Sequence, residues 1–217
     1  MFGVVHRHLL VSLLLTTVTG AAIGYIVAKR WHGGSCGAIS SERCTLRTAM
    51  RKLWADHVIW TRCYLISAIA GLEDVSVAAE RLLKNQDDIG AAVAGFYGAA
   101  AGKKLAQLLR EHIMGATEVV AAAKAKNTEA LNKADAKWHE NAREIAEFLS
   151  KANTHWPYQA MRDMMNEHLA LTTQEAVARI GKQWKEDVSA FDTVFDQILV
   201  MADHLTDGIA AQFPDRV

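Results

Sequence analysis

Apolar side chains recur at every third or fourth residue from about residue 45 to the C-terminal end of the chain. This spacing places them on one side of a helix, whereas a half-buried strand would need alternation at every second residue. The period predicts helices over about 45–70, 74–96, 99–125, 128–152 and 157–171, and a last helix from Thr172 to about Gln212. No segment shows a competing strand pattern. The chain is therefore predicted to be all-α, an antiparallel helical bundle with a four-helix-type core and about six helices.

Turn and capping residues separate these predicted helices. Gly71 and Gly98 follow the first and second apolar stripes, and Pro157 is acceptable in the first turn of a new helix. Thr172 and Glu175 have the spacing of a capping box, in which a threonine and a glutamate satisfy the first backbone N–H groups of a helix. The last helix is therefore predicted to begin at Thr172.

A separate apolar segment precedes the bundle. Residues 9–27 contain no charge and lie between Arg7 and the pair Lys29-Arg30, which is long enough to cross a hydrocarbon core. The pattern predicts a membrane anchor over 1–29 with residues 9–28 in the bilayer, a flexible basic neck over 30–44, and a bundle domain over 45–217. A cleaved signal peptide is the alternative, but the apolar run continues past the candidate cleavage site at Ala21.

Charge is distributed unevenly along a chain whose formal net charge is zero. Residues 1–54 carry seven Lys and Arg against one acid, and the rest carries 17 basic against 23 acidic side chains. A basic neck on a mildly acidic body fits a membrane surface better than nucleic acid. By the positive-inside rule, the body of this single-pass protein is expected on the cytoplasmic or matrix-like side.

An acidic residue directly precedes a histidine four times, which the composition does not explain. The pairs are Asp56-His57, Glu111-His112, Glu167-His168 and Asp203-His204. His57, His112 and His168 each lie on an apolar stripe near the middle of a predicted helix, so an antiparallel bundle would bring them to a similar level. Metal sites in bundles are built from such inward side chains, and imidazole with carboxylate suits iron, zinc, manganese or copper.

The sequence therefore predicts a candidate metal site formed by His57, His112 and His168. Asp88 is a tentative further ligand, with Asn85 and Asn141 as other residues that could complete the site. Asp56, Glu111 and Glu167 are expected only as supporting residues, because neighbours on a helix diverge by about 100°. The alternative interpretation is that the histidines are ordinary core residues with hydrogen-bond partners. A Glu-x-x-His pattern and a Cys-x-x-Cys-His motif are both absent from the sequence.

No sequence motif indicates a reaction. The chain has no Gly-x-Ser-x-Gly, no Walker loop and no dinucleotide-binding fingerprint. Together with the predicted anchor, this favours a non-catalytic accessory or structural subunit of a membrane-associated assembly, whose partners are the membrane and other protein subunits. The alternative function is a metal-binding or redox bundle with a buried site of histidine and carboxylate.

Several stretches of the body carry a family resemblance. They are LWADHVIWTR (53–62), LLKNQDDIG (82–90), LLREHI (108–113), EHLALTTQEAV (167–177) and ADHLTDGIAAQFP (202–214). Through them the region from about Arg51 to Phe213 resembles a family of small uncharacterised bacterial all-helical proteins. The resemblance implies a stand-alone helical domain and no particular activity. Members of that family lack an anchor, so it also implies a bacterial-type domain adapted to a membrane.

Overall fold

The computed structural model describes residues 41–217. Its helices are α2 (Ser41–Ala70), α3 (Val75–Tyr97), α4 (Ala99–Lys124), α5 (Thr128–Ala152), α6 (Tyr158–Ile180) and α7 (Trp184–Gln212). The predicted anchor at 1–29 and most of the predicted neck lie outside the described residues. None of the helices within 41–217 is long and apolar enough to cross a membrane.

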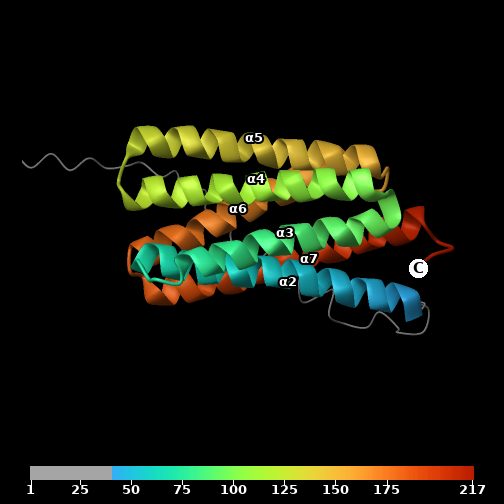
Figure 1. The fold of residues 1–217 in the computed structure, drawn as a ribbon, viewed down its shortest axis with the longest axis horizontal. Coiled ribbons are helices and arrows are strands. Elements are labelled where there is room, and N and C mark those ends of the chain that lie inside the picture. Colours follow the sequence, from blue (N-terminus) through green and yellow to red (C-terminus); the bar gives the residue numbers. More distant parts are fainter. Residues whose placement is uncertain (1–40) are drawn as a thin grey trace, which may run out of the picture. The chain divides into compact units, whose positions relative to one another are not determined.

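The six helices run side by side in alternating directions, as Figure 1 shows. Each helix packs against the one before and the one after it in the chain, and α7 packs against α2 to close the ring. All six helices contribute to one large apolar cluster. The prediction of an all-α antiparallel bundle is confirmed, but the predicted four-helix-type core is wrong, because all six described helices contribute to one core.

The boundary predicted at Thr172 is wrong. Thr172 is buried within α6, which continues to Ile180, and the chain turns only at residues 181–183. Glu175 does not reach back to cap a helix, because its carboxylate is buried and accepts a hydrogen bond from Arg62 at 2.6 Å. Helix α2 begins at Ser41, so it includes the last residues of the predicted neck.

The bundle consists of three similar hairpins, α2–α3, α4–α5 and α6–α7. Their central histidines are separated by 55 and 56 residues, and each hairpin turns through a left-handed residue 14 positions after its histidine. These residues are Gly71, Lys126 and Lys182, with φ of 72°, 55° and 59°. In each turn the N–H of the residue that follows the left-handed one donates to the carbonyl five residues earlier. This hydrogen bond is typical of helix ends that have a residue in the left-handed conformation. The bonds are Leu72 to Ser67 at 2.9 Å, Asn127 to Ala122 at 3.1 Å and Gln183 to Ala178 at 2.8 Å.

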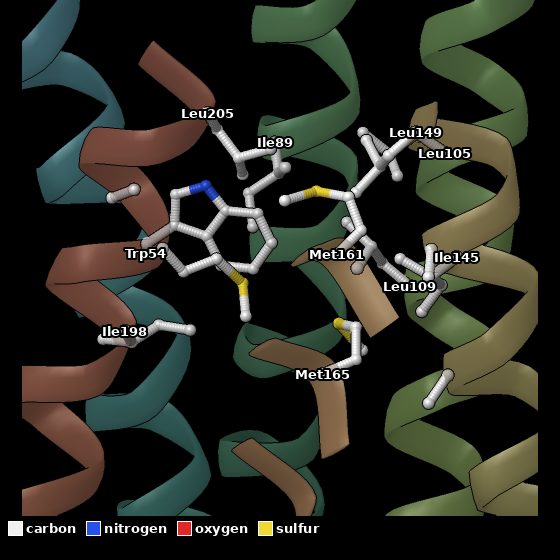
Figure 2. Packing of buried hydrophobic residues seen from close by; sticks show 14 of the residues in the cluster. Trp54, Ile89, Leu105, Leu109, Ile145, Leu149, Met161, Met165, Ile198 and Leu205 are labelled. Carbon is white, nitrogen blue, oxygen red and sulfur yellow. The ribbon is translucent and has the colours of Figure 1, made fainter. Parts of the chain in front are cut away.

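The same repeat organises the core on the far side of the histidines from these turns. Seven and three residues before each histidine, the first helix of every hairpin buries a large apolar side chain. The residues are Met50, Leu105 and Met161, and then Trp54, Leu109 and Met165. Most of them are labelled in Figure 2, where they interdigitate with Ile89, Ile145 and Leu205 of the second helices. Only a cavity of about 10 Å³ remains among them.

Aromatic side chains cover the end of the bundle opposite the hairpin turns. The ring of Tyr97 lies 5.6 Å from that of Trp156 and 5.2 Å from that of Phe213, measured between centroids. Its hydroxyl accepts a hydrogen bond from Asn153 at 2.8 Å and donates one to Gln212 at 3.0 Å. Burial raises the pKa of Tyr97 to about 12, so the hydroxyl keeps its proton. This end of the core is closed.

Candidate functional site

Three imidazoles meet in the interior of the bundle, one from the first helix of each hairpin. The ring centroid of His168 lies 5.6 Å from that of His57 and 6.4 Å from that of His112. The three side chains are 3%, 2% and 5% exposed for His57, His112 and His168. They lie together because each occupies the same position of the repeat, on the inward face of α2, α4 or α6.

Two of these histidines are held by amides from the second helix of their own hairpin. His112 Nδ1 lies 3.0 Å from Asn141 Oδ1, and His168 Nδ1 lies 3.2 Å from Gln197 Oε1. The amide nitrogens donate at 3.1 Å to the carbonyls of Leu108 and Met164, four residues before each histidine. This second bond fixes the amide orientation, so both histidines donate from Nδ1 and keep a lone pair on Nε2.

The first hairpin departs from this arrangement. Asn85 donates to the carbonyl of Leu53 at 3.0 Å, while Gln86 Nε2 lies 3.3 Å from His57 Nδ1. Gln86 also donates to the Leu82 carbonyl at 2.8 Å and to Asn85 Oδ1 at 3.1 Å, so its nitrogen is oriented as a donor. An amide nitrogen cannot accept a hydrogen bond, so His57 Nδ1 faces it unprotonated and the His57 proton lies on Nε2; the two amide hydrogens are shared among the three acceptors. Gln86 Oε1 is buried without a hydrogen-bond partner among residues 41–217.

The surroundings keep all three imidazoles neutral. Burial lowers the pKa of His112 to about 3 and that of His168 to about 4. Burial also lowers the pKa of His57 well below its ordinary value, and the neighbouring His168 and His112 lower it further. Neutral imidazole can accept or donate a hydrogen bond or bind a metal. The centre is therefore polar but uncharged at neutral pH.

The acidic residues predicted around this centre lie elsewhere. Asp88, the tentative ligand, is on the surface of α3 and pairs with Lys84. Asp56 pairs with Lys52 at 2.7 Å and Arg81 at 3.4 Å. Asp56 and Asp88 are partly exposed and are engaged in these ion pairs, and Glu111 and Glu167 are exposed to solvent. Among residues 41–217, no group of three or more His, Cys, Asp or Glu side chains is arranged to hold a metal ion.

A cavity of about 290 Å³ begins about one helical turn beyond the histidines, toward the hairpin turns. Its walls come mainly from α2, α4, α5 and α6 and are predominantly apolar. Residues four, five and eight positions after the histidines recur in the lining. They include Thr61, Leu65, Thr117, Val120, Thr172 and Ala176.

Side-chain size explains why this half of the bundle is hollow. At the position eight residues after each histidine, Leu65 on α2 corresponds to Val120 on α4 and to Ala176 on α6. These three residues form a small apolar cluster of their own, separate from the main core. Because the side chain shrinks from leucine to alanine around the ring, the three helices do not fill the space between them.

A buried ion network lies beside the cavity. Arg62 donates to Glu175 at 2.6 Å and to Asp187 at 3.0 Å, and Arg179 donates to Asp187 at 2.8 Å. The two acids are only 1% and 2% exposed. Burial raises the pKa of Glu175 to about 7, although the Arg62 guanidinium lowers it. The Arg62 guanidinium also lies over the Phe191 ring, 4.7 Å from its centroid. This network links α2, α6 and α7.

Arginines assigned from the sequence to the basic N-terminal region are engaged within the bundle. Arg51 donates to both carboxylate oxygens of Asp203, at 2.8 and 2.6 Å. Arg43 and Arg47 pair with Asp207. These contacts join the start of α2 to the end of α7, so much of the positive charge expected to face a membrane is paired with acids of the bundle.

The partner amides were only partly visible in the sequence. The sequence indicates Asn85 and Asn141 as residues that could complete the site, but no local pattern indicates Gln86, Gln197 or the ion network. In each hairpin an amide side chain lies 29 residues after the histidine. That constant spacing, with the 55- and 56-residue spacing of the histidines, is the signal that would have revealed the repeat.

The fold and the site together define an all-α protein built from three repeated hairpins around a buried histidine centre and an adjoining cavity. No protein-family model, curated protein or solved structure matches this chain significantly. The resemblance to small bacterial helical proteins therefore stays a prediction.

Proposed function

We propose that the bundle binds a small, mostly apolar molecule in the cavity on the turn side of the histidine centre. The observation that carries this proposal is the 290 Å³ cavity with predominantly apolar walls, formed by side chains on five packed helices, mainly α2, α4, α5 and α6. Binding sites for small molecules are typically concave and apolar, with a few polar groups that orient the ligand. A ligand that displaces water from such walls gains about 25 cal/mol for each Å² of apolar surface buried.

The residues that line the cavity support ligand binding rather than catalysis. Its polar groups are threonine and tyrosine hydroxyls, a tryptophan, and Asn132 and Asp135 on α5. The cavity has no nucleophile paired with a base among its lining residues within 41–217. The neutral histidine centre fixes the three helices at the floor of the cavity, so the walls are positioned by repeated side-chain-to-backbone hydrogen bonds.

Fluorescence titration with the uncharged probe N-phenylnaphthylamine tests the proposal. The wild-type protein should bind one equivalent of the probe saturably. Ala176→Leu should weaken binding by about tenfold or more, because the larger side chain fills the cavity. Ala170→Leu is the matched control, since Ala170 is an exposed residue of the same helix. Absence of saturable binding, or equal binding by a folded Ala176→Leu variant, would overturn the proposal.

A transition metal at the three histidines is a second proposal. It is supported by the tautomer of His112 and His168, whose Nδ1–H groups are oriented by amides, as is typical of metal ligands. The unpartnered Gln86 Oε1 adds a buried acceptor beside His57. The rings would have to move, because the present arrangement does not hold an ion. A melting temperature raised by Zn²⁺ in the wild type but not in His112→Ala would support this function.

The role of a membrane-associated accessory subunit rests mainly on residues 9–28, which lie outside the described residues. It is compatible with ligand binding by the bundle and stays a prediction. Migration of gently solubilised protein in a larger complex on native electrophoresis would support it.

A further inference from the structure

We infer that the ligand is a single-chain amphiphile whose hydrocarbon chain lies in the cavity along the helices and whose polar end stays at a mouth between α5 and α6. This inference rests on the proposed function and adds the chemical class of the ligand. It follows from three features of the cavity: the length of its walls, the chemistry of their surface and the position of the exposed residues that line it.

The walls of the cavity extend along the axis of the bundle. Lining residues occur on α4 from Ile113 to Ala123 and on α6 from Thr172 to Ile180. At the rise of an α-helix these spans are about 15 and about 12 Å long. A sphere with the same volume of 290 Å³ would be only about 8 Å across. Walls of this length suit a linear ligand better than a compact one.

The surface of the walls suits a hydrocarbon chain. Aliphatic side chains supply much of the lining, among them Leu65, Leu82, Ile113, Val119, Val120 and Ile180. Thr61 donates its hydroxyl hydrogen to the His57 carbonyl at 2.8 Å, and Thr117 donates to the Met114 carbonyl at 2.8 Å. An apolar chain beside these two threonines therefore leaves their hydroxyl hydrogens paired. Each methylene group buried against such walls should raise the affinity by about fourfold.

The mouth of the cavity lies between α5 and α6. Within 41–217, the lining residues that are exposed to solvent are Asn132 on α5 and Thr173 and Val177 on α6. A residue that lines the cavity and also reaches solvent marks its opening. The two helices are joined at their other ends by residues 153–157 and diverge toward the hairpin turns (Figure 1).

This mouth accounts for the polar end of the ligand. The interior offers both a donor, the unpartnered Trp138 Nε1–H, and acceptors, the oxygens of Thr61 and Thr117, so it does not select one kind of polar group. A polar group left at the mouth keeps its hydrogen bonds with water, whereas its burial would cost free energy. The chain is therefore the part of the ligand that the protein recognises.

Displacement of N-phenylnaphthylamine by three ligands tests this inference. Decan-1-ol and 1-adamantanol have the same number of carbon atoms, but the first is linear and the second is a compact cage. We expect decan-1-ol to bind more tightly by about tenfold or more, because only the linear chain contacts the full length of the walls. Decyl maltoside, used below its critical micelle concentration, carries the same chain on a large sugar head. It should bind within about threefold of decan-1-ol, because its head stays outside.

Val177→Trp tests the position of the mouth. The larger side chain should obstruct the opening and weaken the binding of decyl maltoside by about tenfold or more. Val188→Trp is the matched control, because the two valines are 55% and 52% exposed for Val177 and Val188 and only Val177 lines the cavity. The control variant should bind decyl maltoside as the wild type does.

The possible results separate the two proposals. Binding of 1-adamantanol as tight as that of decan-1-ol, failure of decyl maltoside to displace a probe that decan-1-ol displaces, or unchanged binding by Val177→Trp would each overturn the inference while ligand binding itself stands. Failure of the probe and of all three ligands to bind would overturn the proposed function, and the inference would fall with it.

Discussion

The two halves of this bundle use the same repeated hairpin and are stabilised in different ways. On the sealed side of the histidines, Met50, Trp54 and their counterparts on α4 and α6 fill the space between the helices. On the turn side, the corresponding positions carry smaller side chains, which leave a cavity of about 290 Å³. A buried ion network beside that cavity joins α2, α6 and α7. Apolar packing dominates one half, and ion pairs contribute to the other.

This difference shows how a repeated fold can acquire a site. The backbone repeat places three equivalent side chains around a common centre, and the size of those side chains decides whether the layer is solid or hollow. The histidine layer lies between the two halves, and in two of its three hairpins the histidine Nδ1 is hydrogen-bonded to an amide oxygen. The hollow half can therefore change its lining without disturbing the packed half.

The largest expected effect comes from breaking the ion network of the hollow half. Arg62→Met removes the partner of Glu175 and one partner of Asp187, which leaves buried carboxylates without full compensation. Loss of one member of a buried pair typically costs about 3–5 kcal/mol. In urea unfolding at pH 8, the free energy of unfolding of the variant should be lower than that of the wild type by this amount. The difference should be smaller at pH 6, where Glu175 takes up a proton.

Lys137→Met is the control for this variant. It removes an ion pair with Glu118 at 2.9 Å, in which both side chains are largely exposed to solvent. Exposed pairs of this kind contribute little to the free energy of unfolding. Equal losses in the two variants would show that the network does not stabilise the hollow half.

The second prediction concerns pH and the layer between the two halves. Each buried histidine has a folded-state pKa below its unfolded value of about 6.5, so its stabilising contribution is present above pH 6.5 and is lost as the pH falls. For His168 and His112 that loss extends to about pH 4 and about pH 3. Acidification from pH 7 to pH 5 should therefore lower the free energy of unfolding by about 2 kcal/mol for each of these two histidines.

Glu175 acts in the opposite direction. Its folded-state pKa of about 7 lies above the ordinary value of 4.5, so its contribution is present below pH 4.5 and is lost as the pH rises through 7. Urea unfolding of Glu175→Gln should therefore show a steeper loss on acidification than the wild type. His155→Gln is the control, because the His155 side chain is exposed and lies outside the histidine layer, so its replacement should leave the profile unchanged. A flat wild-type profile between pH 7 and pH 5 would contradict the buried, neutral state of the histidines.

The third prediction tests the packed half. α3 and α4 approach so closely that a Cβ atom at Gly90 would lie 2.6 Å from the Gly102 carbonyl oxygen. Gly102→Ala should push these backbones apart and cost about 1–3 kcal/mol, as overpacking of a core does. Gly95→Ala is the control, because a Cβ there would meet nothing within 4 Å. That variant should gain stability, since alanine favours a helix. Thermal unfolding of both variants would measure the difference.

The helices and the three inward histidines could be predicted from the sequence because they depend on local periodicity. The turn between α6 and α7 could not, because the local spacing of Thr172 and Glu175 indicated a helix start within what is the interior of α6. Thr172 and Glu175 matched a capping pattern, but their burial depends on α2 and α7, which are distant in the sequence. The spacing within one helix was insufficient to place that boundary.

The chemistry of the site depends even more on tertiary structure. The acid next to each histidine was conspicuous in the sequence, yet it points away from the centre, while the true partner amide lies 29 residues later on another helix. The cavity was invisible because it arises from small side chains on separate helices, each unremarkable alone. Only comparison of the three hairpins with one another would have shown that Leu65, Val120 and Ala176 share a position.

The smallest expected effect distinguishes the three hairpin turns. Gly71 occupies the left-handed position of the first turn without strain, whereas Lys126 and Lys182 occupy it in the others. A residue with a Cβ atom is less stable in the left-handed conformation by about 1–2 kcal/mol. Glycine avoids this strain, but it loses more conformational entropy on folding, which cancels part of the gain. Lys126→Gly should therefore raise the free energy of unfolding by about 0.5–1 kcal/mol. Lys133→Gly, in the interior of α5, should lower it by about 1 kcal/mol. Chemical denaturation of the two variants separates these effects, because the same substitution should have opposite signs at the turn and in the helix. Equal destabilisation by both would mean that the Lys126 side chain contributes contacts to the turn that outweigh its backbone strain.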